Sequence, residues 1–127
     1  MYDICIETDE NSVNLASIGE TLGGGGVNIF GLSLARCNGR DIIHLAVKDA
    51  EAANNALKAS GIEIKAVTEV YVLDKDRKKI TGKPGNFGSI CRALANNGIG
   101  ISFGYPAEDN RYIFGVDDLV RARALLG

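Results

Sequence analysis

The second half of the sequence repeats the pattern of the first half, and this repeat constrains the fold more than any other feature. The paired segments share their apolar positions and a turn that precedes a helix; they are residues 12–18 with 84–90, 26–29 with 98–101, and 45–49 with 114–118. Repeats in register indicate duplicated supersecondary units. We therefore expect two copies of one unit, residues 1–67 and residues 68–127.

Hydrophobic periodicity predicts the elements of the first copy. Residues 2–7 alternate apolar and polar side chains, which predicts a half-buried strand, whereas Leu15, Ile18 and Leu22 fall on one helical face. Asn11 or Ser12 is expected to cap this helix, and the glycine run at 23–26 is expected to end it. We read this run as a stop signal and not as a phosphate loop, because it follows a helix.

The rest of the copy continues as strand, hairpin, strand and helix. Strand-like residues 27–36 and 42–47 flank Asn38-Gly39, a strong hairpin signal. Asp49 is expected to cap a second helix that Gly61 closes. The sequence therefore predicts an α+β fold of two ferredoxin-like βαββαβ repeats, with antiparallel sheets and the helices on one face.

Residues 62–73 form one β-rich run, which we expect to serve both copies and to bend near residues 66–68. The sequence ends at Gly127, directly after the last expected helix, so we expect the second copy to lack a final strand of its own. An open sheet edge is usually covered or paired. A homodimer is the expected solution.

The turn at residues 81–87 is the strongest candidate for a binding site. Gly82 and Gly85 permit a tight turn, and Pro84 suits the first position of a helix. A helix that begins here presents unpaired N–H groups and a partial positive charge to the turn, which favours a small carboxylate or phosphate. The alternative is an ordinary helix start without a ligand.

Composition excludes several classes of protein. A net charge of −2 and a pI near 5.4 provide no basic field for nucleic acid. We see no signal peptide, and no apolar stretch approaches the roughly 20 residues of a membrane helix. We therefore expect neither nucleic acid nor a membrane as partner. The three cysteines are scattered along the sequence, so we expect reduced thiols and a cytoplasmic location.

The sequence shows no recognisable set of catalytic residues. We identify no Ser/His/Asp or Cys/His set and no cluster of metal ligands, so we expect no catalytic residue, metal or cofactor. The only histidine, His44, lies in a strand and is interpreted as a packed or interface residue. An acylphosphatase with this fold would need an arginine in the turn, and neither copy has one there.

The run Lys83-Pro84-Gly85-Asn86-Phe87, followed by Ile90, Leu94 and Gly98-Ile99-Gly100-Ile101, resembles the ACT domain. The resemblance covers nearly the whole chain. As a tandem pair, the chain is similar to small stand-alone tandem ACT proteins. The first copy departs from the pattern, with Ser12-Val13 in place of Pro-Gly, whereas Asn28 supplies the asparagine that Gly100 lacks.

This resemblance implies a regulatory protein that senses a free amino acid at the strand-to-helix turns and at an interface between repeats or subunits. Mapped by position, the ligand-binding residues are Asp9, Asn11, Ser12, Val13 and Asn14 in the first copy, and Lys83, Pro84, Gly85, Asn86 and Phe87 in the second. Backbone N–H groups would bind the carboxylate, and Asp or Asn side chains would bind the ammonium. The alternative function is an interaction module that binds no ligand and pairs with a partner protein through sheet edges.

Overall fold

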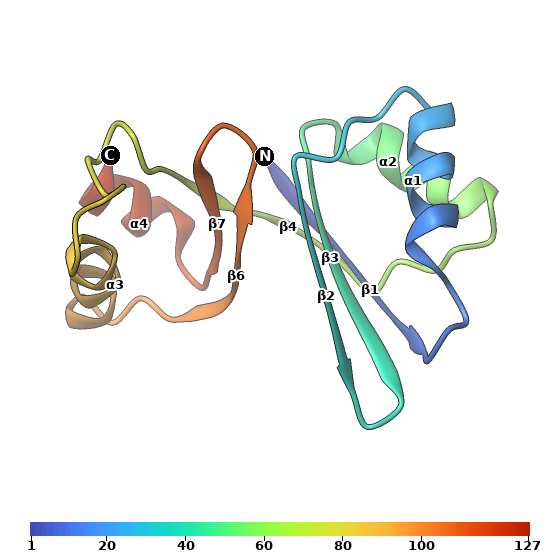
Figure 1. The fold of residues 1–127 in the computed structure, drawn as a ribbon, viewed down its shortest axis with the longest axis horizontal. Coiled ribbons are helices and arrows are strands. Elements are labelled where there is room, and N and C mark those ends of the chain that lie inside the picture. The colour runs from blue at the N-terminus through green and yellow to red at the C-terminus, as the bar shows by residue number, and fades with distance from the viewer. The chain divides into compact units, whose positions relative to one another are not determined.

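A computed structural model describes all 127 residues and contains seven strands and four helices (Figure 1). They fall into two compact units, residues 1–68 and 69–127. The first contains β1 (Tyr2–Asp9), α1 (Leu15–Gly24), β2 (Gly31–Cys37), β3 (Arg40–Val47), α2 (Ala50–Ala59) and β4 (Ala66–Glu69), whose last residue lies beyond the boundary. The second contains β5 (Tyr71–Asp74), α3 (Asn86–Asn96), β6 (Ile101–Ala107), β7 (Arg111–Val116) and α4 (Leu119–Leu126).

The first unit is an antiparallel sheet covered by two helices. Its strand order is β4-β1-β3-β2, and β3 pairs antiparallel with both β1 and β2. Alternate strand residues such as Ile4 and Leu45 face α1 and α2, which contribute Ile18 and Leu57 to the same fully buried core. The periods of 2 along strands and 3.6 along helices thus bring these apolar residues together.

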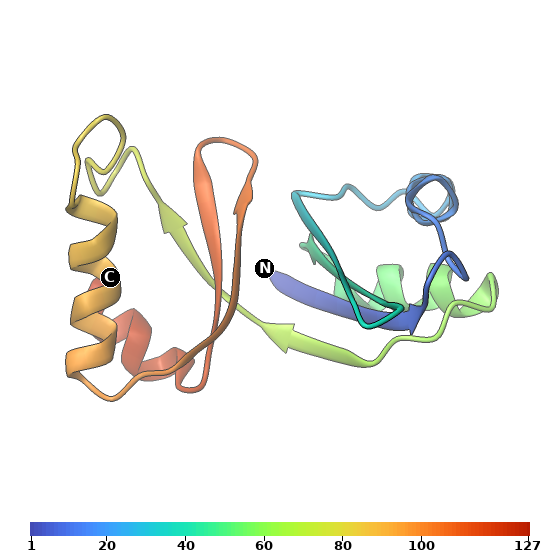
Figure 2. The ribbon, with the colours of Figure 1, turned by 60° about the horizontal axis from the view of Figure 1, so that its bottom comes forward.

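The second unit repeats this arrangement with β6-β7-β5 as its strand order. Phe114 and Leu73 from the sheet belong to the same buried core as Leu94 of α3 and Ala122 of α4. Both helices of this unit lie on one side of its strands (Figure 2). Two βαββαβ-type repeats, the second ending at α4, confirm the predicted α+β class with antiparallel sheets. None of the helices combines the length and hydrophobicity needed to cross a membrane.

Local sequence signals account for several boundaries. Asn38 and Gly39 have φ angles of 52° and 74° between the partnered residues Cys37 and Arg40, as a type I′ hairpin requires. The Asp49 carboxylate accepts from the Ala52 N–H at 3.0 Å and caps α2, as predicted. The glycine run ends α1, as predicted, with Gly25 at its C-cap.

Two strand predictions are wrong in their extent. The run 62–73 serves both units, as predicted, because β4 lies beside β1 and β5 pairs with β7. It is not one bent strand, since the buried residue Val70 separates β4 from β5 and residues 62–65 lie outside any strand. The second strand begins at Gly31 instead of residue 27. β-Branched residues lie on both sides of the breaks, with Ile64 and Val67 at one and Val70 and Val72 at another, so strand propensity alone does not locate them.

Candidate ligand-binding turns

The turn between β1 and α1 is closed by the protein's own groups. The Ser12 N–H donates to the Asp9 carbonyl at 3.0 Å, and Asn11 adopts a left-handed φ of 62°. The cap of α1 is Asn14, whose side-chain oxygen accepts from the Ser17 N–H at 2.8 Å. The expected cap at Asn11 or Ser12 is therefore wrong, because a β-turn from Asp9 to Ser12 precedes the helix and its cap falls at Asn14.

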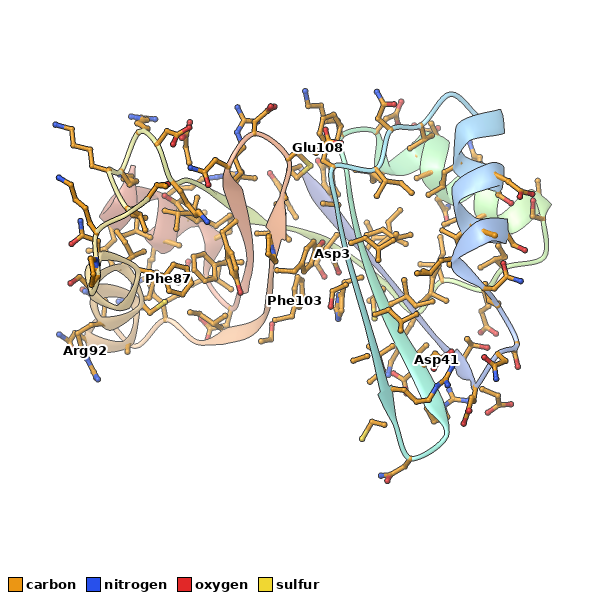
Figure 3. All side chains as sticks on the ribbon, in the orientation of Figure 1. Asp3, Asp41, Phe87, Arg92, Phe103 and Glu108 are labelled. Carbon is orange, nitrogen blue, oxygen red and sulfur yellow. The ribbon has the colours of Figure 1, made fainter.

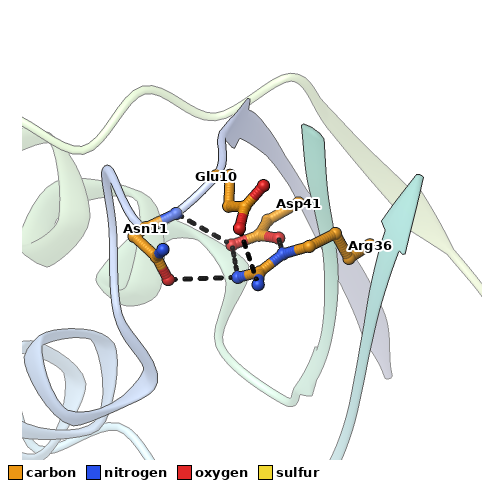
Figure 4. A network of polar contacts seen from close by, with 4 residues as sticks. All are labelled: Glu10, Asn11, Arg36 and Asp41. Atoms are coloured by element: carbon orange, nitrogen blue, oxygen red, sulfur yellow. Dashed lines mark hydrogen bonds and ion pairs between the residues drawn. The ribbon is translucent and has the colours of Figure 1, made fainter. Parts of the chain in front are cut away.

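An ionic network holds this turn against the β2–β3 hairpin (Figure 4). The Arg36 guanidinium donates to the Asp41 carboxylate from Nε at 2.7 Å and to the Asn11 side-chain oxygen at 3.1 Å. Asp41, which is only 2 % exposed, also accepts from the Asn11 N–H at 3.3 Å. Arg36 forms a further ion pair with Glu10 at 3.1 Å. One guanidinium thus fixes both the turn and the buried carboxylate.

The predicted acceptors of the first turn are consequently occupied. Asn11 is bonded to Arg36, and the Asp9 carboxylate accepts from Arg40 at 2.7 Å. The other three predicted residues, Ser12, Val13 and Asn14, lie together on the wall of a surface pocket of about 370 Å³. The rest of its lining is Ser17, Glu20, Thr21, Ser60 and Ile62. The first turn thus keeps a small polar pocket, although two of its five predicted residues serve the ionic network.

The Arg36–Asp41 pair predicts a loss of stability in acid. The hydrogen bond from Arg36 lowers the pKa of Asp41, the Asn11 N–H and the Arg36 charge act in the same direction, and partial desolvation opposes them. A carboxyl that is more acidic in the folded than in the unfolded state stabilises the fold above its unfolded pKa, and this contribution is lost as the pH falls through the folded value. We expect stability to decline below about pH 4.

Urea unfolding of wild type and Arg36→Gln over about pH 2–7 tests this expectation. The variant should be less stable at neutral pH and should lose less stability on acidification. Arg92→Gln is the matched control, because Arg92 extends from α3 without an ion pair (Figure 3). Equal acid dependence in Arg36→Gln and wild type would contradict the assignment.

The turn before α3 differs because its helix start has no side-chain cap. Gly85 occupies the N-cap position with φ 88°, and no side chain accepts a hydrogen bond from the first turn of α3. The other helices are each capped by an Asx side chain, namely Asn14, Asp49 and Asp118. The expectation that Pro84 begins the helix is wrong, since the left-handed Gly85 separates Pro84 from the first helical residue, Asn86.

Open donors remain at this turn. The Asn86 N–H donates to the Lys83 carbonyl at 3.2 Å, and the Ser89 N–H donates to the Gly85 carbonyl at 3.0 Å. Between them, the N–H groups of Phe87 and Gly88 make no hydrogen bond within the protein. They occupy the positions that a capping side chain normally serves. A carboxylate oxygen of a ligand can therefore take the place of the missing cap.

Three side chains, those of Lys83, Asn86 and Phe87, lie at the start of α3 beside the open donors. The Asn86 side-chain amide donates to the Lys79 carbonyl at 3.0 Å, which leaves its oxygen as an acceptor. The Phe87 ring packs edge-on against Tyr112 at 5.1 Å between centroids. Lys83 is exposed and forms no ion pair, so its ammonium adds a mobile positive charge beside the donors.

The loop that leads to this turn is held in place from two sides. The Asn110 side chain donates to the Asp76 carboxylate and to the Thr81 hydroxyl, both at 2.6 Å. Ile80 is buried, and its N–H donates to the Lys75 carbonyl at 2.9 Å. The turn is therefore presented on a fixed loop.

Sequence reasoning missed the ionic network of the first turn. Arg36 and Asp41 are direct partners across the β2–β3 hairpin. The Asn-Gly turn sets that register, so an opposite-charge cross-strand pair could have been predicted. The bonds from Arg36 to Asn11 and Glu10 bridge 25 and 26 residues, and no local pattern encodes them.

Comparison with known proteins supports the fold. The sequence matches no protein-family model and no curated protein significantly. The structure is similar to that of protein BT0572 from Bacteroides thetaiotaomicron, with TM-score 0.79 and 20 % identity over 98 % of this chain and 85 % of that one. It is also similar to the ligand-free regulatory subunit of aspartate kinase from Thermus thermophilus, with TM-score 0.71 and 15 % identity over 98 % and 87 % of the two chains.

A third similar structure is that of aspartokinase α and β subunits, with TM-score 0.66 and 16 % identity over 98 % of this chain and 88 % of that one. At these identities the likeness concerns the fold. The chain therefore has an ACT-like α+β fold that it shares with a regulatory subunit of an enzyme.

Proposed function

We propose that this chain is a non-catalytic regulatory protein that binds a free amino acid at the strand-to-helix turn before α3. The observation that carries the proposal is the uncapped start of α3, where the N–H groups of Phe87 and Gly88 lack a partner. A ligand carboxylate would accept from these groups, and the side-chain oxygen of Asn86 would accept from the ligand ammonium. Lys83 and the positive end of the helix dipole favour the carboxylate further.

The fold likeness supports a regulatory role, because one similar structure is a regulatory subunit in its ligand-free form. The ACT-like pattern around Pro84 and Gly85 supports an amino acid as the ligand. In the first unit, Ser12, Val13 and Asn14 form the corresponding polar pocket. We propose this pocket as the weaker of the two sites, because Asn14 already caps its helix.

A cytoplasmic homodimer belongs to the same proposal. The strand β5 lies at an edge of the sheet and pairs with β7 on one side only. Pairing two such edges would satisfy their open backbone groups. Sedimentation equilibrium tests this assembly, and a monomer mass at all concentrations would contradict it.

We expect a thermal-shift screen of the proteinogenic amino acids to identify at least one stabilising ligand. Hydrogen bonds to charged groups contribute about 1.5–3 kcal/mol each. Three or four of these, less ordering costs, correspond to a Kd between roughly micromolar and millimolar. At 100 times its Kd, a ligand stabilises the folded state by about 2.7 kcal/mol, which raises the melting temperature measurably.

The variant Gly85→Asp should weaken this binding by at least about tenfold, because a fixed carboxylate would repel the ligand carboxylate from the open donors. Gly98→Asp is the matched control: Gly98 has a similar left-handed φ of 69° and open space for a side chain, so both variants carry comparable backbone strain. Isothermal titration calorimetry gives the two Kd values. Equal Kd values would contradict binding at this turn.

The alternative is an interaction module without a ligand, which the open edge of β5 favours. A folded protein that responds to no amino acid and co-purifies with a stoichiometric partner protein would support that function instead.

A further inference from the structure

The first unit also contains a charged pocket, which is separate from the polar pocket beside α1. It has a volume of about 350 Å³ and is lined by Glu7 of β1, Arg40 of β3, and Glu63, Ile64 and Lys65 from the segment that leads into β4. None of these residues belongs to the predicted turns. The volume lies at the lower end of the range for small-molecule sites, which suits a metabolite of a few heavy atoms.

The charges of this pocket are held by neighbouring groups. The backbone N–H of Lys65 donates to the Cys5 carbonyl at 2.8 Å, which fixes the segment against β1, and its ammonium pairs with the Glu7 carboxylate. Asp9 holds one end of the Arg40 guanidinium at 2.7 Å. The other end lies 3.8 Å from Glu7, beyond hydrogen-bonding distance. Arg40 is therefore oriented by one carboxylate while its second amino group stays available.

Glu63 is the carboxylate without a partner in this pocket. It forms neither an ion pair nor a hydrogen bond, and its side chain is exposed. Glu7 remains ionised at neutral pH, because the hydrogen bond from Lys65 lowers the pKa of Glu7, although partial desolvation opposes this shift. The lining thus carries two cations and two anions, and one group of each sign has free bonding capacity.

We propose that this pocket binds the charged α-amino and α-carboxylate groups of a small zwitterion. The ligand carboxylate would accept from the free amino group of Arg40 and from Lys65, and its ammonium would donate to Glu63 and Glu7. The four lining charges sum to zero. An anionic ligand would therefore leave the carboxylates of Glu7 and Glu63 without a new counter-charge, and a cationic ligand would do the same to Arg40 and Lys65. Ile64 is the apolar residue of the lining and offers a contact for an aliphatic side chain.

Because its charged groups are partly exposed, the pocket should bind weakly, with a Kd in roughly the millimolar range. The ligand class, a free amino acid, is the one named in the proposed function. The choice of amino acids as probes therefore rests on that proposal. The two sites nevertheless use different residues, so separate amide signals report them.

The test is a titration of the ¹⁵N-labelled chain with glycine and with leucine, alongside acetate and methylammonium as the separated halves of glycine. We expect both zwitterions to shift the amide signals of residues 7, 40 and 63–65 and to bind there at least about tenfold more tightly than acetate or methylammonium. Glu63→Gln and Arg40→Gln should each weaken this binding several-fold. The matched controls are Glu108→Gln and Arg92→Gln, whose exposed side chains lie in the second unit (Figure 3).

Three outcomes would overturn the proposal. Acetate that binds as tightly as glycine would show a plain anion site, and unchanged binding in Glu63→Gln would remove the ammonium contact. Zwitterion shifts confined to Phe87 and Gly88 would place the ligand at the α3 turn alone and leave the proposed function intact. Conversely, shifts at this pocket without shifts at Phe87 and Gly88 would support the pocket and contradict the proposed turn.

Discussion

Replacing Leu94 with alanine is expected to lower the free energy of unfolding by about 2–5 kcal/mol. Leu94 of α3 is 0 % exposed and belongs to the core of the second unit, which also contains residues of the sheet and of α4. Truncation removes buried methyl groups and leaves a cavity that the surrounding aromatic residues fill only in part. The same helix presents the open donors, so its packing also positions the proposed site.

Leu125→Ala on α4 is the matched control, because Leu125 is the same residue type and is 40 % exposed. Its loss should be about 1 kcal/mol or less. Urea denaturation followed by circular dichroism measures both variants. A Leu94→Ala loss no larger than that of Leu125→Ala would contradict the described packing of α3.

Replacing Gly115 with alanine is expected to cost about 1–3 kcal/mol. The ring of Phe103 lies across Gly115, and a Cβ there would meet ring atoms at 2.3 Å. The ring is also stacked on Tyr105 with 6.2 Å between centroids, and Phe103 is the direct cross-strand partner of Gly115. The whole ring must therefore shift for alanine to fit.

The background variant Phe103→Ala separates this steric effect from a strand-propensity effect. When the ring is absent, Gly115→Ala should cost only a few tenths of a kcal/mol or become slightly stabilising, because Gly115 has no left-handed φ. The difference between the two backgrounds is the coupling energy of the contact. Equal costs in both would contradict the close approach of the ring to the backbone.

Signals confined to a few neighbouring residues were predictable. Asn38-Gly39 specified a hairpin, and Asp49 specified a helix cap, because each effect depends on φ preferences or on a side chain that reaches three residues along the chain. The repeat then arranged these elements into a βαββαβ order. The fold class followed from the sequence for this reason.

Helix starts were less predictable. Asn11, Ser12 and Asn14 are all competent caps, and the structure selects Asn14 because Arg36 and Asp41 hold Asn11 in the preceding turn. Pro84 and Gly85 permit a helix start at either residue, and the left-handed φ of Gly85 decides between them. Contacts between distant residues and backbone angles, which local patterns do not encode, settle such choices.

The position of the candidate site in the sequence was predictable, but the hydrogen bonds formed there were not. The sequence indicated two turns with open amides, whereas the structure closes part of the first with Arg36 and Arg40 and leaves the second uncapped. The second turn is therefore the principal site in our account.

The most direct test is an NMR titration that follows the amide signals of Phe87 and Gly88 in the full chain with each proteinogenic amino acid. We expect at least one amino acid to shift both signals with saturation, as the carboxylate accepts from these N–H groups, and we expect Gly85→Asp to abolish the shifts while Gly98→Asp preserves them. A folded protein in which neither signal moves with any amino acid would contradict the account.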